Sequence, residues 1–482
     1  MATRRQQVCS AKFNLTALIG VIMISIAERK NRERVRALTM RENALVVQRT
    51  RKSAKMLEVA SRSLSGGVAS SYQFRKPCPI YIDRGNGPVV WDVDGNEMWD
   101  FHNGFGSMIQ GHAHPAIGYA VRDRYTKGTH FAAPTEDGII VADELQRRWG
   151  LGQWRYTNSG SEATMDAIRI ARGFTGRDTV MKIFGSYHGH HDAVMVSIAG
   201  EYETIGHADS LVSVPFGAGI PKSTVDLTVA VPYNDAAAME RRIESLIRQG
   251  RKPACVIMEA VPMNMRVILP EPGYLEAVRE ITSRYGIVLI FDEVKTGLSI
   301  ASGGATERFG VRPDLVTLAK ALGAGLPMGA VGGTEDVMSV VKDGRVYQVG
   351  TFNGNPMCMS AARANLLEVL TPEAYTRLEE LSRRLVSACN SVLADSAIPG
   401  YSLGLGAKGC VTFSASKIVD YRSFQANRDE ELSQLFWLYC FNRGIYTAPN
   451  RDQEWTLSVV HTAESVDAYA AVLGEMVSDI AG

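Results

Sequence analysis

Apolar runs and helical spacings alternate through the middle of the chain. Between about residues 110 and 350, helical patterns are interrupted by short apolar runs such as those at 254–258 and 287–291. A short run of this kind suits a buried strand, and its alternation with helices predicts a mostly parallel sheet. Farther along, residues 372–395 and 430–442 have helical spacing around a strand-like stretch at 409–413. The pattern predicts a large α/β domain and a smaller α+β C-terminal domain.

The N-terminal part of the chain has shorter patterns. Residues 40–65 have helical spacing, and two apolar stretches around the Asp94-Gly95 turn predict a hairpin. We therefore expect an N-terminal segment at 40–109 that joins the small domain, a large domain at 110–355 and the small domain at 356–482.

Charge is distributed unevenly, although the formal net charge is only +1. Residues 1–60 hold 13 Lys or Arg and 4 Glu, and their apolar run at 15–27 is too short to span a bilayer as a helix. We interpret residues 1–39 as a basic leader that is disordered or not translated, with translation starting at Met40. We expect neither a membrane nor a nucleic acid as a partner.

Composition restricts the class of protein. A chain of 482 residues, 45% of them hydrophobic, is long enough for two domains that share a large core. Its seven cysteines have no paired spacing, which favours neither a disulfide framework nor a zinc site and indicates a reduced, cytoplasmic protein. The histidines at 188, 190 and 191 lack the accompanying ligands of a metal site, so no metal is expected.

Two strand-like runs each end in a charged residue. Asp292 closes the run that starts at Ile287, and Lys320 closes the stretch that starts at Pro313. Because the carboxyl ends of strands in an open α/β sheet face the ligand crevice, both side chains should enter one site. This pair suits Schiff-base catalysis on pyridoxal phosphate, in which the aspartate keeps the pyridine nitrogen protonated. The alternative is a buried structural ion pair.

Two further motifs precede this pair. Residues 158–164 open a helix with small polar residues and a glycine, and free N–H groups at a helix start suit a phosphate. An ordinary N-cap is the alternative for this string. Tyr187, followed by His188 and Gly189, comes after an apolar run at 180–184, where its ring could stack on a heterocycle. Taken alone, it would be a loop tyrosine.

In this order, together with Gly350-Thr351-Phe352, these motifs resemble the class III aminotransferases of pyridoxal phosphate fold type I. The resemblance covers about residues 64–475, and within the family the chain is most similar to the glutamate-1-semialdehyde aminomutase branch. It implies that Lys320 is the Schiff-base lysine, that Asp292 pairs with the pyridine nitrogen and that the protein is a homodimer. The remaining implied cofactor-binding residues are Ser159, Gly160, Ser161, Tyr187, His188, Glu259, Val294 and, from the neighbouring subunit, Thr351.

The chain departs from the aminomutases where substrate is expected to bind. Counting from Gly66 places Gln73 where the aminomutases carry an arginine for the substrate carboxylate. A neutral amide cannot replace that bidentate charge pairing. Arg75 and Arg266 are alternative carboxylate-binding residues. The acidic residue of the C-terminal family motif falls at Gln453, or at Glu454 if the count shifts by one.

The resemblance and the departures together predict a pyridoxal 5′-phosphate-dependent aminotransferase. We expect an amino acid as donor and a keto or oxo acid as acceptor, including those of a specialised biosynthetic pathway. One alternative is a glutamate-1-semialdehyde 2,1-aminomutase, which moves an amine within one molecule by the same two half-reactions. A non-catalytic binding protein that kept the fold is an alternative of another class, and the retained Lys320 and Asp292 argue against it.

Overall fold

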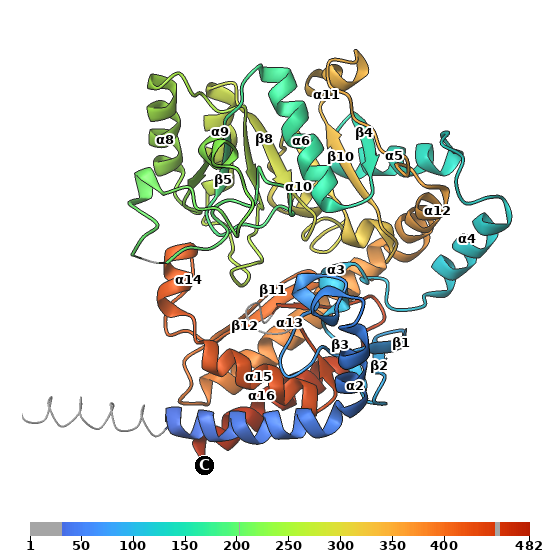
Figure 1. The fold of residues 1–482 in the computed structure, drawn as a ribbon, viewed down its shortest axis with the longest axis vertical. Helices are drawn as coiled ribbons and strands as arrows, with labels where there is room; N and C mark the ends of the chain where they lie inside the picture. The colour runs from blue at the N-terminus through green and yellow to red at the C-terminus, as the bar shows by residue number, and fades with distance from the viewer. Residues whose placement is uncertain (1–30, 202, 449–453) are drawn as a thin grey trace, which may run out of the picture.

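The computed structural model describes residues 31–201, 203–448 and 454–482. Figure 1 shows a large sheet-centred part above and a smaller part below, with the helix over residues 31–49 running along the lower edge. The predicted cofactor-binding residues belong to elements of the upper part.

Seven strands among the described residues form the large sheet, in the order β4-β10-β9-β8-β7-β5-β6. β10 pairs antiparallel with β4 and with β9, whereas the remaining neighbours pair parallel. The strands are β4 (Gln153–Thr157), β5 (Val180–Ile183), β6 (Thr228–Val231), β7 (Cys255–Met258), β8 (Val288–Asp292), β9 (Leu315–Leu318) and β10 (Gly329–Gly333). This mixed, mostly parallel sheet confirms the predicted fold class.

Alternate residues of the central strands point to opposite faces, and each face packs against its own helices. Ile257 and Ile290 pack with apolar residues of α6 and α11, whereas Val256 and Leu289 pack with those of α8 and α9. Burial of both faces explains why these strands are continuous apolar runs in the sequence. The helices of this part are α4 (Pro115–Thr126), α5 (Glu136–Trp149), α6 (Gly160–Thr175), α7 (Lys222–Leu227), α8 (Ala236–Arg248), α9 (Tyr274–Arg284), α10 (Gly304–Phe309), α11 (Glu335–Lys342) and α12 (Pro356–Ala364).

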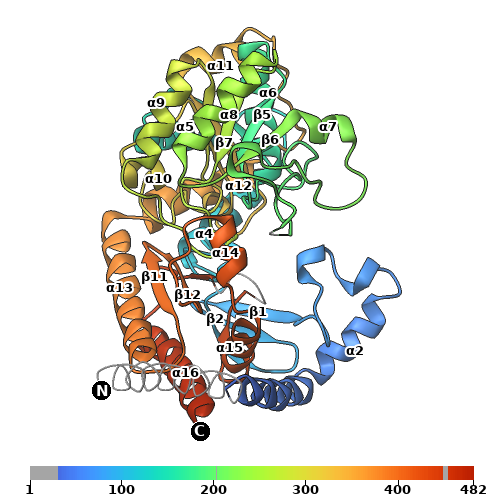
Figure 2. The same ribbon diagram turned by 90° about the vertical axis from the view of Figure 1, so that its left-hand side faces the viewer.

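The smaller part combines two short sheets with the last helices. One sheet has the order β1-β2-β3-β13 and the other β11-β12-β14, and β3 pairs in parallel with β13. Figure 2 shows α13 running beside β11 and α16. The elements are β1 (Ile82–Asn86), β2 (Val89–Asp92), β3 (Glu97–Asp100), β11 (Tyr401–Leu405), β12 (Lys408–Thr412), β13 (Ile445–Tyr446), β14 (Glu454–Thr456), α13 (Pro372–Ala394), α14 (Tyr421–Asn427), α15 (Glu430–Asn442) and α16 (Ala463–Ala481).

Short helical turns connect these elements. The first ones follow α2 (Arg51–Ala60) and carry the segment that the sequence linked to substrate binding, and a later one begins at Lys320. These turns are η1 (Ser65–Gly67), η2 (Ser71–Gln73), α3 (Asn103–Gly106), η3 (Ala208–Ser210), η4 (Lys320–Gly323) and η5 (Asn365–Val369).

The structure differs from the expected leader at residues 31–39, which belong to the helix over 31–49. Val35 and Leu38 are 2% and 4% exposed and pack in the core that α15 and α16 also fill. Burial of two apolar side chains supplies the reason why this stretch is helical and docked rather than disordered. Residues 1–30 lie outside the described part of the chain.

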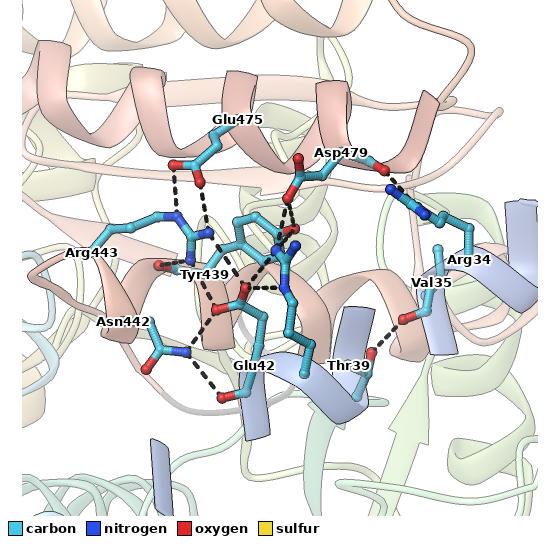
Figure 3. A network of polar contacts seen from close by, with 10 residues as sticks. Arg34, Val35, Thr39, Glu42, Tyr439, Asn442, Arg443, Glu475 and Asp479 are labelled. Carbon is cyan, nitrogen blue, oxygen red and sulfur yellow. Dashed lines mark hydrogen bonds and ion pairs between the residues drawn. The ribbon is translucent and has the colours of Figure 1, made fainter. Parts of the chain in front are cut away.

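A polar network fastens the same helix to the C-terminal helices. The side chain of Glu42 is completely buried, and its carboxylate accepts bonds from Arg443, Asn442 and Arg41. Arg443 also binds Glu475, and the Arg34 side chain donates to the Asp479 carbonyl at 2.9 Å (Figure 3). These bonds join the N-terminal helix to α15 and α16.

No helix in the described ranges combines the length and apolar character needed to cross a membrane. The described residues also contain no group of three or more His, Cys, Asp or Glu side chains placed to hold a metal ion. The six cysteines of the described chain are free thiols, and all six are buried.

Candidate active site

A cavity of about 500 Å³ lies at the carboxyl ends of β8 and β9. One side of its wall comes from the large sheet, and the other includes Tyr72 and Ser107 from the N-terminal segment. Nine residues predicted to bind the cofactor line this cavity, namely Ser159, Gly160, Ser161, Tyr187, His188, Glu259, Asp292, Val294 and Lys320.

Asp292 is the last residue of β8, and its carboxylate is held on both oxygens. Oδ1 accepts bonds from the Val294 amide at 3.0 Å and the Thr317 hydroxyl at 3.2 Å. Oδ2 lies 2.7 Å from Nδ1 of His188, a fully buried side chain. Thr317 is the register partner of Asp292 on β9, so the sheet itself fixes this contact. The result is a rigid anion in the cavity wall, as a pyridinium partner requires.

The Glu259 carboxylate bonds to the loops around the cavity. One of its oxygens accepts from the Tyr187 amide at 3.3 Å and from the Asn264 side chain at 3.2 Å, and the other accepts from the Met263 amide at 3.2 Å. Burial raises the pKa of this carboxyl above its ordinary value. Glu259 therefore holds the loop that carries the Tyr187 ring at the cavity.

Lys320 follows β9 after one residue, Ala319, and begins the turn η4. Its backbone has a φ of +48°, a left-handed conformation that residues with a side chain rarely adopt and that is concentrated at functional sites. Burial, together with the nearby charge of Lys295, lowers the pKa of its amine to about 8. A lysine with this pKa is partly unprotonated near neutral pH and can act as a nucleophile and a base.

The sequence predicts an anion site at the start of α6. The Ser159 hydroxyl caps the helix by accepting from the Glu162 amide at 3.2 Å, and Glu162 in turn accepts from the Asn158 amide at 2.7 Å. In the described structure the amides of Gly160 and Ser161 donate to no protein acceptor. They point from the positive end of a helix, which is a suitable site for a phosphate.

Gly160 also shows why this turn can approach the ring site. A Cβ atom added there would meet Val294 at 2.9 Å, so any side chain would push the helix start away from the wall. Val294 and Tyr187 both line the cavity, as expected for residues on the two faces of a flat ring. The donors, the anion and the amine of this cavity therefore fit pyridoxal phosphate.

The remaining predicted residues do not line this cavity. Thr351 is exposed in the turn before α12. Gln73 uses its side-chain oxygen to accept from the amides of Ala69 and Ser70, each at 3.1 Å, and so closes its own turn. Its neighbour Tyr72 lines the cavity instead.

Both arginines proposed for carboxylate binding are placed elsewhere. The Arg75 guanidinium stacks on the Trp437 ring with its central carbon 3.0 Å from the ring centroid, and burial lowers its pKa to about 9. Arg266 is 3% exposed, and its Nη2 donates to the Ser433 hydroxyl at 2.7 Å. Arg75 and Arg266 line other cavities, so neither faces the cavity at the carboxyl ends of β8 and β9.

Sequence reasoning missed Lys295, which lines the cavity three positions after Asp292. Its Nζ donates to Glu454 at 2.7 Å and to the Met263 carbonyl at 3.1 Å. Burial opposes ionisation of Glu454, but Lys295 and Lys408 outweigh it and hold its pKa at about 2. The sequence signal that could have identified Lys295 is its position directly after the motif Phe291-Asp-Glu-Val294. Gln453, the alternative to Glu454, lies outside the described residues.

Comparisons with known proteins agree with this geometry. A family model described as aminotransferase class-III matches residues 71–432. A glutamate-1-semialdehyde 2,1-aminomutase of Syntrophobacter fumaroxidans is 38% identical over 421 residues, which cover 86% of this chain and 95% of that protein. The solved omega-transaminase from Sphaerobacter thermophilus is 35% identical with a TM-score of 0.84, covering 89% of this chain and 98% of its own. A transaminase solved with PLP bound is 30% identical with a TM-score of 0.79, covering 89% and 98%.

Proposed function

Since this chain belongs to the class-III aminotransferase family, we propose that it transfers an amino group between two molecules, from an amino acid donor to a keto or oxo acid. It is an enzyme that uses pyridoxal 5′-phosphate. When bound, this cofactor supplies an electron sink that makes loss of a proton from the amine-bearing carbon feasible.

The residues of the cavity have separate tasks in this proposal. Asp292, fixed by Thr317 and His188, keeps the ring nitrogen protonated. The amides of Gly160 and Ser161, with the Ser159 turn, hold the phosphate, and Tyr187 and Val294 enclose the ring. Lys320, with a pKa of about 8, moves the proton at the reacting carbon.

The observation that supports an intermolecular reaction is the lack of an arginine among the described residues that line the cavity. Among the described residues, the cationic side chains with ammonium or guanidinium groups that line the cavity are Lys295 and Lys320, and no arginine does so. Gln73 stands where the aminomutase resemblance requires an arginine, and its oxygen is bound to its own turn. A site without that bidentate donor disfavours glutamate-1-semialdehyde.

A glutamate-1-semialdehyde aminomutase is the second candidate. The name of the 38% identical relative from Syntrophobacter fumaroxidans favours it, and the cofactor end of the cavity suits it equally well. The two candidates share both half-reactions and differ in whether the amine leaves the first molecule.

The purified enzyme distinguishes them directly. We expect slow conversion of glutamate-1-semialdehyde to 5-aminolevulinate and faster amine exchange with members of a panel of amino acids and keto acids. Each half-reaction is followed separately by the visible absorbance of the cofactor. Efficient 5-aminolevulinate formation without exchange on the panel would replace our proposal with the aminomutase.

We also propose a homodimer in which Thr351 reaches the neighbouring phosphate site. The turn around Thr351 carries exposed apolar side chains, with Tyr347, Val349 and Phe352 exposed by 78%, 64% and 57%. Phe352 packs on His130 at 4.9 Å and so extends this patch toward the exposed Phe131. A second copy of the chain would cover such a patch. Sedimentation of the wild type as a monomer at micromolar concentration would contradict it.

A cytoplasmic location completes the proposal. It is supported by the six buried free thiols of the described chain, which suit a reducing compartment. Fractionation of the source cells with an antibody against the enzyme tests it, and recovery outside the cytoplasm would contradict it.

A further inference from the structure

One charged side chain interrupts the apolar strand that leads to Tyr187. Lys182 lies within β5 and is completely buried, as the other residues of this strand are. Its register partners on the neighbouring strands are Ala230 of β6 and Ile257 of β7, both apolar. A buried amine destabilises a fold unless it is hydrogen-bonded, so the acceptors around Lys182 indicate what the strand gains from it.

The acceptors of Lys182 are backbone carbonyls at the two ends of one loop. Its Nζ donates to the Ser186 carbonyl at 2.8 Å and to the Val196 carbonyl at 2.8 Å. A longer contact of 3.5 Å reaches the Ser197 carbonyl. Lys182 therefore closes the base of the loop over residues 185–197.

The two loop ends depend on this amine. Ser186 and Val196 are fully buried, and in the described ranges of the chain no other group donates to either carbonyl. A buried carbonyl that loses its donor keeps its desolvation cost without compensation, so the loop ends would rearrange without Lys182.

The protonation state of Lys182 does not decide whether these bonds form. Burial lowers the pKa of its amine to about 7, although the nearby charge of Glu259 opposes this shift. The charged form has three N–H donors and the neutral form has two. Both forms can therefore make the two short bonds to the loop.

The Ser186 carbonyl belongs to the peptide group that joins this residue to Tyr187. Lys182 donates to the oxygen of this group, and Glu259 accepts from its N–H at 3.3 Å. Two buried side chains thus bond to opposite ends of one peptide group and fix its orientation. Tyr187 itself lines the cavity.

The next residue, His188, connects the same loop to the anion of the cavity. Its Nδ1 lies 2.7 Å from Oδ2 of Asp292, and its carbonyl accepts from the Thr164 hydroxyl of α6 at 2.6 Å. Lys182 does not line the cavity, so its influence on a bound cofactor has to pass through this loop.

We propose that Lys182 is a positioning residue that holds the Tyr187–His188 segment in place for the cofactor ring. The inference rests on the proposed function only in its assignment of Tyr187 and Asp292 to that ring. By donating to both ends of the loop, Lys182 keeps Tyr187 at the cavity and His188 within hydrogen-bonding distance of Asp292. Binding the cofactor then requires no further ordering of the loop.

Cofactor affinity in one variant and its matched control tests this role without turnover. Lys182→Met keeps a long unbranched side chain but removes the bonds to the loop. Serial dilution of the holoenzyme, followed by visible absorbance, should show a rise of about 10- to 100-fold in the apparent Kd of pyridoxal 5′-phosphate. The control Val180→Ala lies on the same face of β5. It should lower the thermal midpoint and leave this Kd within about twofold of the wild type.

A conservative variant and a spectroscopic signal separate positioning from general stability. Lys182→Gln keeps N–H donors on its side-chain amide and should recover part of the affinity that Lys182→Met loses. It also serves as the test variant if Lys182→Met does not fold. The circular dichroism of the bound cofactor depends on how the ring is held. This signal should decrease in Lys182→Met and stay unchanged in Val180→Ala.

A double variant shows whether the effect passes through Tyr187. Tyr187→Ala removes the ring that the loop positions, so adding Lys182→Met should raise the Kd by a smaller factor than it does in the wild-type background. An equal factor in the two backgrounds would overturn the inference.

Two other results would also contradict it. They are a wild-type Kd in both Lys182 variants, and a rise in Kd for Val180→Ala as large as that for Lys182→Met. None of these measurements depends on amine exchange, so they are distinct from failure of the proposed function, which the panel of donors and acceptors reveals.

Discussion

The cofactor end of the cavity is built from residues next to one another in short motifs, whereas the substrate end is built from distant ones. Asp292 ends β8 and Val294 follows it two positions later, and Ser159, Gly160 and Ser161 are consecutive at the start of α6. At the other end, Lys295 meets Glu454 from 159 positions away, and Glu454 meets Lys408 from 46 positions away.

This difference shows how one family can keep its cofactor chemistry and change its substrate. The anion, amine and helix start of the cofactor end are fixed by the large sheet and one helix. The opposite wall combines Tyr72 of the N-terminal segment with Lys295, and Lys295 is held by Glu454 of β14, which also binds Lys408 of β12. Substitutions at the cofactor end should therefore lower the rate for every substrate alike, and those at the substrate end should change the ratio between substrates.

Lys320→Ala should have the largest effect. It removes the nucleophile and the base of every half-reaction, so the rate should fall by about 10³-fold or more for all donors. The visible absorbance of the lysine-bound cofactor, which borohydride bleaches in the wild type, should also disappear. An unchanged thermal midpoint serves as the control for folding. Turnover close to that of the wild type would contradict the assignment of Lys320.

Asp292→Asn should come next, with a loss of about 100-fold or more in rate for every substrate. The amide keeps the hydrogen-bonding shape of the carboxylate but cannot stabilise a charge on the ring nitrogen. Cofactor occupancy, measured beside the rate, should stay high. If Asp292→Asn changed the ratio of rates between amino donors instead of lowering every rate alike, the two ends of the cavity would not have separate functions.

Glu42→Gln lies outside both ends and should change stability without changing any substrate ratio. It weakens charge-assisted bonds to Arg443 and Arg41, and we expect a loss of about 1.5–3 kcal/mol in the free energy of unfolding. Denaturant unfolding at several pH values measures this loss.

The pH dependence of this loss has a definite sign. Burial opposes ionisation of Glu42, but Arg443 and Asn442 outweigh it and hold its pKa below the ordinary 4.5. The stabilisation is therefore complete above pH 4.5 and lost as the pH falls through the folded-state value. The stability difference between wild type and variant should narrow in that window. A difference that grows toward acid would show that Glu42 is not held ionised.

Arg266→Ala should have the smallest effect on catalysis, although the sequence singled it out for substrate binding. Its side chain is bonded to Ser433 and lines a different cavity, so ratios between substrates should stay within about twofold of the wild type. Ratios are measured as kcat/KM for paired acid and amide substrates. A loss of kcat/KM for the acids alone would show that Arg266 does bind the substrate carboxylate.

The N-terminal helix illustrates a different limit of sequence reasoning. The basic composition of its first residues resembles an untranslated leader, and the two buried apolar residues of the 31–39 stretch, Val35 and Leu38, are too few to predict a docking face. Their partners are on α15 and α16, more than 390 positions later in the chain, as the contact between Arg36 and Glu431 illustrates. The position of the basic stretch over residues 31–39 is therefore determined by its packing against those helices, which the local sequence does not reveal.

The sequence by itself determined the α/β fold, the cofactor and the position of Asp292 and Lys320 at one sheet edge. It could do so because a strand carries its last side chain to a fixed edge and a helix start presents its amides wherever it lies. Tertiary structure alone decided that Gln73 closes its own turn, that Arg75 stacks on Trp437 and that Lys295 lines the cavity while bonded to Glu454. Those contacts depend on which residues, distant in the sequence, lie next to each side chain in the fold. Burial and neighbouring charges determine whether a charged side chain is available to a ligand or is bonded only to other residues of the protein.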